Sequence, residues 1–124
     1  MLSTILNACQ PTSYVTGTMS PKGISVALSE FINKNQQYVI VSHETLEYPI
    51  YLYRISDENY SALWMKCTHQ GSELQAAGDH LYCTSHGSEF DKMGKVSQGP
   101  AEKNLRTFPV SIMNDKIFIE LTGA

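Results

Sequence analysis

The sequence predicts an all-β domain of many short strands, with a metal-binding segment inserted among them. Short apolar runs alternate with turn-forming residues, and no window holds a sustained helical period. The 124 residues are 42% hydrophobic and 17% charged, a composition that suits one domain with a buried core. Two of the three cysteines and three of the four histidines lie between residues 67 and 101, where the strand pattern stops.

Strands are expected where apolar residues alternate with small or polar ones, or where β-branched and aromatic residues form a short run. The expected strands are residues 24–28, 38–41, 50–55, 60–65, 107–112 and 116–121. Turn-forming residues at 56–59 and at 114–115 predict that the strands on either side of each turn form a hairpin. One helical turn fits residues 29–34.

The first 22 residues are expected to form an N-terminal arm, and residues 23–124 the folded domain. Residues 10–22 are rich in Pro, Ser, Thr and Gly, a composition typical of a linker. Leu6-Asn7-Ala8-Cys9 looks like a bacterial lipobox, in which Cys9 carries a lipid, with a shortened apolar segment before it. This interpretation predicts a lipid-anchored protein of the cell envelope. The alternative is a frayed N-terminus with a free thiol, in a cytoplasmic protein.

Charge and hydropathy exclude two further classes. The net charge is −3 and the isoelectric point is about 5.7, so the basic surface typical of a nucleic-acid-binding protein is absent from the sequence. No apolar run approaches the roughly 20 residues that a membrane-spanning helix needs. Contact with a membrane is therefore expected only through a lipid on Cys9.

Residues 67–101 contain two short motifs with metal-binding side chains. The first is Cys-Thr-His-Gln-Gly at residues 67–71, and the second is Cys-Thr-Ser-His-Gly-Ser-Glu-Phe-Asp at residues 83–91. Each offers one thiolate and one imidazole, which are ligands of both zinc and iron–sulfur sites. Strand-like sequence in this segment is limited to residues 80–82, and so long an irregular stretch needs a bound group to order it. A structural zinc site is one interpretation, although such sites more often use Cys-x-x-Cys pairs.

The two motifs resemble those of the Rieske iron–sulfur proteins, namely Cys-Thr-His-x-Gly followed by Cys-x-x-His-Gly-Ser-x-Phe-Asp. The resemblance implies a fold of stacked antiparallel sheets with an inserted subdomain that binds a [2Fe–2S] cluster. It implies that Cys67 and Cys83 ligate one iron, and that His69 and His86 ligate the other iron, closer to the surface.

The neighbours of these ligands bear on the stability of the expected cluster. Gly71 and Gly87 allow backbone conformations that bring N–H groups toward the cluster sulfurs. In family members that oxidise quinols, each loop has an extra cysteine, and the two form a disulfide. Ser72 and Ser85 occupy these positions here, so the resemblance implies that the covalent clamp is absent.

Three further residues bear on the reduction potential. Ser88 matches a family serine that donates a hydrogen bond to a cluster sulfur, whereas Phe90 stands where a tyrosine hydroxyl is common. Pro100 lies in a Gly-Pro-Ala sequence that matches the loop covering the cluster in respiratory members. With one potential-raising hydrogen bond kept and one lost, the midpoint is expected to lie between those of quinol-oxidising members and dioxygenase ferredoxins.

Three functions are compatible with the sequence. The first is one-electron transfer between a donor and an acceptor protein in a membrane-linked or respiratory chain. The second is a soluble Rieske ferredoxin that feeds an oxygenase or reductase, and the third is a zinc-stabilised binding module. No nucleophile–base arrangement stands out in the sequence, so the chain is expected to be an electron carrier, or a subunit of an oxidoreductase, and no enzyme by itself.

Overall fold

The computed structural model describes residues 13–32 and 36–122. Cys9 and the lipobox-like sequence lie outside the described residues. The elements in chain order are β1 (Tyr14–Thr16), β2 (Thr18–Ser20), β3 (Gly23–Ala27), α1 (Ser29–Ile32), β4 (Tyr38–Ser42), β5 (Ile50–Arg54), β6 (Tyr60–Trp64), β7 (Gln75–Ala77), β8 (His80–Tyr82), β9 (Glu89–Asp91), β10 (Val96–Gln98), β11 (Thr107–Phe108), β12 (Val110–Met113) and β13 (Lys116–Glu120).

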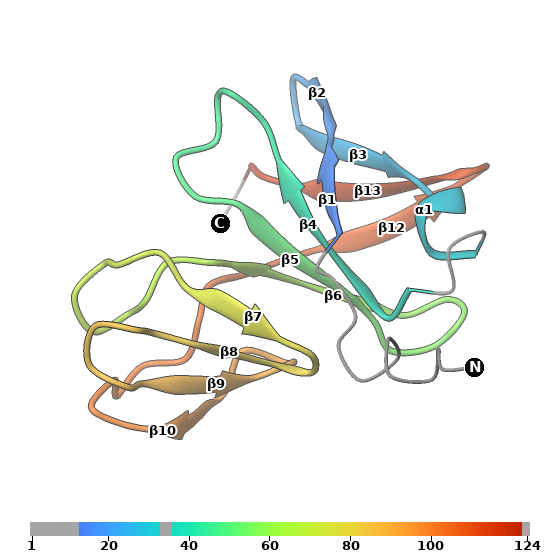
Figure 1. Cartoon of the computed structure of the whole chain (residues 1–124). Coiled ribbons are helices and arrows are strands. Elements are labelled where there is room, and N and C mark those ends of the chain that lie inside the picture. Colours follow the sequence, from blue (N-terminus) through green and yellow to red (C-terminus); the bar gives the residue numbers. More distant parts are fainter. Residues whose placement is uncertain (1–12, 33–35, 123–124) are drawn as a thin grey trace, which may run out of the picture.

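The strands form three sheets, as the all-β prediction requires (Figure 1). The central sheet has the order β1-β4-β5-β6-β11, the second β12-β13-β3-β2, and the third β10-β9-β8-β7. Strand β1 pairs with β4 in parallel, and the other paired strands are antiparallel. No helix among the described residues has both the length and the apolar character needed to cross a membrane.

The central sheet is buried on both faces, because the second and third sheets cover opposite sides of it. On β5, Ile50 and Leu52 face the second sheet, whereas Tyr51 and Tyr53 face the third. This two-sided burial explains why β5 is a continuous apolar run, since alternation with polar residues is typical of a strand with one wet face. The domain therefore has two hydrophobic cores that share one sheet.

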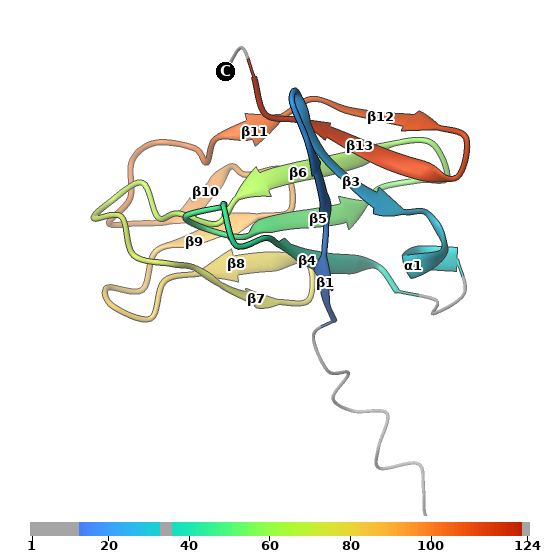
Figure 2. The ribbon, with the colours of Figure 1, turned by 90° about the horizontal axis from the view of Figure 1, so that it is seen from above.

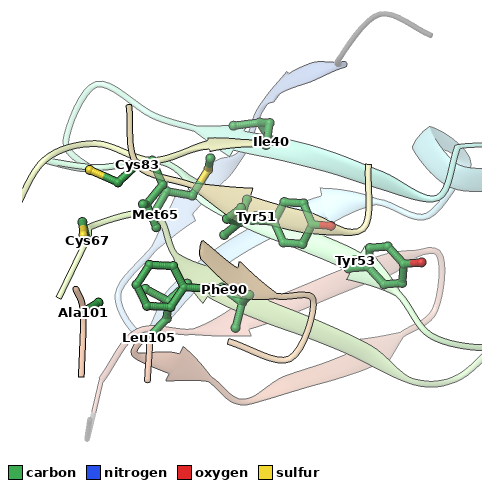
Figure 3. Packing of buried hydrophobic residues seen from close by; sticks show 12 residues of the cluster. Ile40, Tyr51, Tyr53, Met65, Cys67, Cys83, Phe90, Ala101 and Leu105 are labelled. Carbon is green, nitrogen blue, oxygen red and sulfur yellow. The ribbon is translucent and has the colours of Figure 1, made fainter. Parts of the chain in front are cut away.

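The core between the central and third sheets leads to the metal-binding motifs. Figure 3 shows Cys67 and Cys83 at one end of this core, away from Tyr53. The buried members of this core are Ile40, Tyr51, Tyr53, Leu63, Met65, Cys67, Leu74, Leu81, Cys83, Phe90, Ala101 and Leu105. The two thiols are thus the end of a packed apolar layer, which fixes their depth in the protein.

The interpretation of residues 10–22 as an irregular arm is wrong for residues 14–20. Strand β1 joins the edge of the central sheet beside β4, and β2 joins the edge of the second sheet beside β3. Each strand is only three residues long and follows an exposed–half-buried–exposed pattern. So few apolar side chains leave little signal in the sequence.

Two other expectations also need correction. Residues 67–101 contain four strands, β7 to β10, instead of the single one expected at 80–82. The run 107–112 is two strands, because Pro109 has no N–H for a continuous ladder and separates β11 in the central sheet from β12 in the second. The two expected hairpins, β5–β6 and β12–β13, are confirmed.

Gly23→Ala is expected to lower the free energy of unfolding by about 1–3 kcal/mol, the usual cost of overpacking. An added Cβ would lie 2.1 Å from the carbonyl oxygen of Ile119, in the backbone of the paired strand β13. Urea unfolding checks this. Gly99→Ala is the control, because the nearest atom to its Cβ is 3.8 Å away. Equal stability of the two variants would contradict the close approach of β3 and β13.

Candidate metal centre

The two metal-binding motifs form two loops at the same end of the molecule, at the left in Figures 1 and 2. The first loop, residues 67–72, follows the central-sheet strand β6 and leads toward β7. The second, residues 83–88, connects β8 and β9 of the third sheet. The sheets therefore bring together segments that are separated by a complete hairpin, β7–β8.

The two loops have the same backbone hydrogen bonds. In the first, the N–H of Cys67 donates to the Ser72 carbonyl at 2.8 Å, and the N–H of Gly71 donates to the Cys67 carbonyl at 2.9 Å. In the second, the N–H of Cys83 donates to the Ser88 carbonyl at 2.9 Å, and that of Gly87 to the Cys83 carbonyl at 3.0 Å. Both loops need the glycine, because Gly71 has a φ of 77° and Gly87 a φ of 83°.

The two cysteines lie inside the protein and contact each other. Cys67 is 2% exposed and Cys83 3% exposed, and both are free thiols. Both side chains belong to the same buried cluster, and that of Cys67 helps to lower the pKa of Cys83. The N–H of His69 donates to Sγ of Cys67 at 3.4 Å, so each loop turns a backbone donor toward its own sulfur.

Cys83 is prepared to carry negative charge. Burial raises the pKa of its thiol. Hydrogen bonds lower the pKa by a larger total amount, and they come from the backbone of His86 and Ser85 and from the side chains of Cys67 and Ser85. The net effect is a pKa below the ordinary value. A thiolate is the form in which cysteine binds metal, so the loop favours the ligating state before any metal arrives.

The two histidines lie outside the two cysteines, at the surface. His69 and His86 are both exposed, and their ring centroids are 5.1 Å apart with an angle of 86° between the ring planes. Their ring nitrogens have no hydrogen-bond partner among the residues that the structure describes. The four side chains thus fall into a buried sulfur pair and an exposed imidazole pair.

Ser88 lies behind the loops with a hydroxyl that is only half used. It is 0% exposed, and its oxygen accepts a hydrogen bond from the N–H of Ala101 at 3.0 Å. No group in the described part of the chain accepts the hydrogen of this hydroxyl. A buried donor without an acceptor is uncommon, so this hydrogen is available to a bound group.

Residues 99–106, between β10 and β11, form a third side of the site, next to the two loops. Thr68 Oγ1 donates to the carbonyl of Lys103 at 2.6 Å and so ties this segment to the first loop. Thr68, His69 and Pro100 line a shallow pocket together with Glu102 and Lys103. Pro100 therefore lies in the same pocket as His69.

Phe90 and the two loop serines also lie near the site. The Oγ atoms of Ser72 and Ser85 are 3.3 Å apart, so the two serines meet between the loops. Phe90 is fully buried in the same core as the two cysteines.

The donor set fits a centre with two metal ions. Two buried thiols and, outside them, two neighbouring imidazoles would supply a matched pair of ligands to each of two metal ions. The spare hydroxyl hydrogen of Ser88 and the backbone N–H groups directed at the sulfurs suit a group that carries sulfide and negative charge. In residues 13–32 and 36–122, no three or more Cys, His, Asp or Glu side chains gather around a single ion position.

Comparison with known families places the chain. The model of the Rieske [2Fe-2S] domain matches residues 24–109. The chain belongs to this family. Its cofactor is accordingly the Rieske-type [2Fe–2S] cluster, which the family membership favours over the structural zinc site.

Individual relatives agree with the family assignment. The cytochrome b6-f complex iron-sulfur subunit of Synechococcus sp. (strain CC9605) is 38% identical over 55 residues, which make up 43% of this chain and 31% of that relative. The match therefore spans about a third of the relative's length.

Solved structures show the same fold. The cyanobacterial plasma membrane Rieske protein PetC3 from Synechocystis PCC 6803 superposes with a TM-score of 0.65 at 23% identity, over 78% of this chain and 98% of that chain. The Sphingomonas yanoikuyae B1 ferredoxin gives a TM-score of 0.52 at 24% identity, over 68% of this chain and 85% of that chain. At these identities the likeness concerns the fold alone.

Three polar side chains at the site were missed in the sequence. They are Tyr48, Thr68 and Gln98, and each donates a hydrogen bond to a backbone carbonyl in or beside the loops. Tyr48 and Gln98 lie outside both motifs, and only the folded chain brings them near. Thr68 lies inside the first motif, but its partner is 35 residues further on.

Replacing either cysteine is expected to abolish the cluster. Cys67→Ser and Cys83→Ser should give colourless protein with loops that are open to protease, because the loops contain few apolar residues and metal binding supplies much of their folding free energy. Visible absorption and limited proteolysis check this. Cys9→Ser is the matched control and should keep the wild-type spectrum. A normal cluster spectrum in either loop variant would contradict the assignment.

Proposed function

We propose that this protein carries single electrons through its [2Fe–2S] cluster, with Cys67 and Cys83 as ligands of the inner iron and His69 and His86 as ligands of the outer iron. The observation that carries the proposal is the division of these side chains into a buried sulfur pair and an exposed imidazole pair. When bound, such a cluster supplies a one-electron couple at about −150 to +300 mV.

The protein's own groups make this couple usable. The exposed rings of His69 and His86 give a partner protein close access to the centre, whereas the apolar core behind Cys67 and Cys83 keeps water from the sulfurs. Backbone N–H groups and the Ser88 hydroxyl stabilise negative charge on the sulfur side, which favours the reduced state.

We further propose that the donor and acceptor are proteins of a membrane-linked or respiratory chain, in which this protein serves as an electron-carrying subunit of an oxidoreductase. The similarity to a cytochrome b6-f complex iron-sulfur subunit supports this setting. A lipid on Cys9 would hold the protein at the membrane of the cell envelope, and the sequence from Leu6 to Cys9 motivates that part of the proposal.

A Rieske ferredoxin that feeds an oxygenase or reductase is the second candidate. Two observations favour it, namely the serines that replace a disulfide between the loops and the phenyl ring of Phe90 where a hydroxyl would raise the potential. The fold is shared with a ferredoxin, although with a lower TM-score than with the plasma membrane protein.

The proposed function is tested by spectroscopy and a redox titration of the holoprotein. The expected result is a Rieske-type absorption spectrum that bleaches reversibly with one electron, together with an electron paramagnetic resonance signal that appears on reduction. A midpoint clearly above the lower end of the range of about −150 to +300 mV supports the respiratory role, and one at that lower end supports the ferredoxin role. A colourless protein that contains zinc would refute both.

Ser88→Ala is expected to keep the cluster and to lower its midpoint by about 20–60 mV. This shift is the net worth of one hydrogen bond, about 0.5–1.5 kcal/mol, at 59 mV per tenfold change for one electron. The physical reason is that the more negative reduced state loses more when the hydroxyl is removed. Protein-film voltammetry measures the shift. Ser97→Ala, on the exposed face of β10, is the control and should leave the midpoint unchanged.

A further inference from the structure

Each of the two cluster loops is held by a side chain from outside the loop, at the same backbone position. The hydroxyl of Tyr48 donates to the carbonyl of Gly71 at 2.7 Å. Nε2 of Gln98 donates to the carbonyl of Gly87 at 3.1 Å. Because the two loops have the same internal hydrogen bonds, Gly71 and Gly87 are equivalent residues, and so are the two side-chain contacts.

A hydrogen bond to the carbonyl of either glycine restrains the backbone of its loop. The N–H of each glycine closes the turn onto the carbonyl of the cysteine, and the carbonyl of the same residue points outward to the donating side chain. His69 lies two residues before Gly71, and His86 directly precedes Gly87. A donor on the glycine carbonyl therefore limits the movement of the backbone that carries each histidine.

The ring of Tyr48 is held in place by side chains outside the first loop. Its ring packs edge-on against Trp64 with ring centroids 5.6 Å apart, and Nζ of Lys66 lies 5.5 Å from the ring centroid. Tyr48 belongs to the segment between β4 and β5, so it connects the first loop to the central sheet. Gln98 ends β10, at the edge of the third sheet. Each loop is thus tethered to a different sheet.

The side-chain hydrogen bond between the loops is long by comparison. Ser72 and Ser85 meet through hydroxyls 3.3 Å apart, which is a long distance for a hydrogen bond between two hydroxyls. Cys67 and Cys83, the cysteines of the loops, are free thiols. The position of each loop therefore depends on the structure that lies behind it.

We propose that Tyr48 and Gln98 are positioning residues that hold the two cluster loops closed, in place of a covalent bond between the loops. The proposal rests on the proposed function, since the closed loops matter for retaining the cluster. Tyr48 has the larger effect, because its hydrogen bond is shorter and partly buried, whereas that of Gln98 is exposed.

The test removes each donor without changing the shape of the side chain. Tyr48→Phe and Gln98→Met are expected to speed cluster release to a ferrous-iron chelator by roughly two- to tenfold, the equivalent of one hydrogen bond. Tyr53→Phe and Gln75→Met are matched controls on β5 and β7. Neither control removes a hydrogen bond among the described residues, so both should release the cluster at the wild-type rate.

Amide hydrogen exchange gives a second readout that does not depend on the cluster. The N–H groups of Gly71 and Gly87 report the opening of their own loops. Tyr48→Phe should speed exchange at Gly71 more than at Gly87, and Gln98→Met should do the reverse. Equal acceleration at both glycines and in β5 would mean general destabilisation and would overturn the proposal. Unchanged exchange and unchanged release in both variants would also overturn it.

A rescue experiment tests whether Tyr48 and Gln98 act by closing the loops. The double substitution Ser72→Cys with Ser85→Cys, oxidised to a disulfide, should restore slow release in both the Tyr48→Phe and the Gln98→Met background. Failure of the verified disulfide to slow release in either variant would show that the tethers do not act by closing the loops. Failure of the proposed function is recognised separately. Wild-type protein would then lack the [2Fe–2S] spectrum, whereas exchange at Gly71 and Gly87 would still respond to Tyr48→Phe and Gln98→Met.

Discussion

The contact between two buried thiols is the constraint on which the rest of this structure depends. Cys67 and Cys83 must lie side by side in an apolar layer, although they come from loops on two different sheets. At the same time, the histidines two and three residues further on must reach the surface. A six-residue loop closed by a glycine with positive φ meets both demands, and the chain uses this loop twice. Because both loops have this form, the two sulfurs lie together in the interior and the two imidazoles lie together at the surface.

The central sheet makes this arrangement rigid. Its strands contribute alternate residues to the two cores, so the cluster-binding half cannot move without disturbing the packing of the other half. Two further bonds join the halves: Tyr51 donates to the carbonyl of Gly78 at 2.7 Å, and Ser61 donates to that of Lys92 at 2.6 Å. Burial raises the pKa of Tyr51 far above its usual value, so this hydroxyl remains a donor at any ordinary pH.

The sequence predicted the fold class and the longer strands, because a run of several apolar residues rarely occurs by chance. It missed β1, β2, β7, β9 and β10, because strands of three residues bury at most one side chain and depend on neighbours for their pairing. The expected ligand residues lie together because their spacing follows from the loop itself. Tyr48 and Gln98 left no comparable signal, since their contacts arise from the way the sheets stack. The candidate ligands could therefore be predicted from the sequence, whereas the side chains that hold their loops from elsewhere in the fold could not.

Hydrogen bonds differ from a disulfide in ways that bear on function. A disulfide clamp depends on the redox state of its surroundings, whereas hydroxyl and amide donors do not. A protein held by Tyr48 and Gln98 keeps its loop geometry in reducing and oxidising compartments alike, so the tethers suit either of the two redox roles. The cost is a lower barrier to loop opening, because single hydrogen bonds contribute only about 0.5–1.5 kcal/mol each. The bound cluster must then supply the remaining stability of the loops through its bonds to both, and loop closure and cluster retention become one equilibrium.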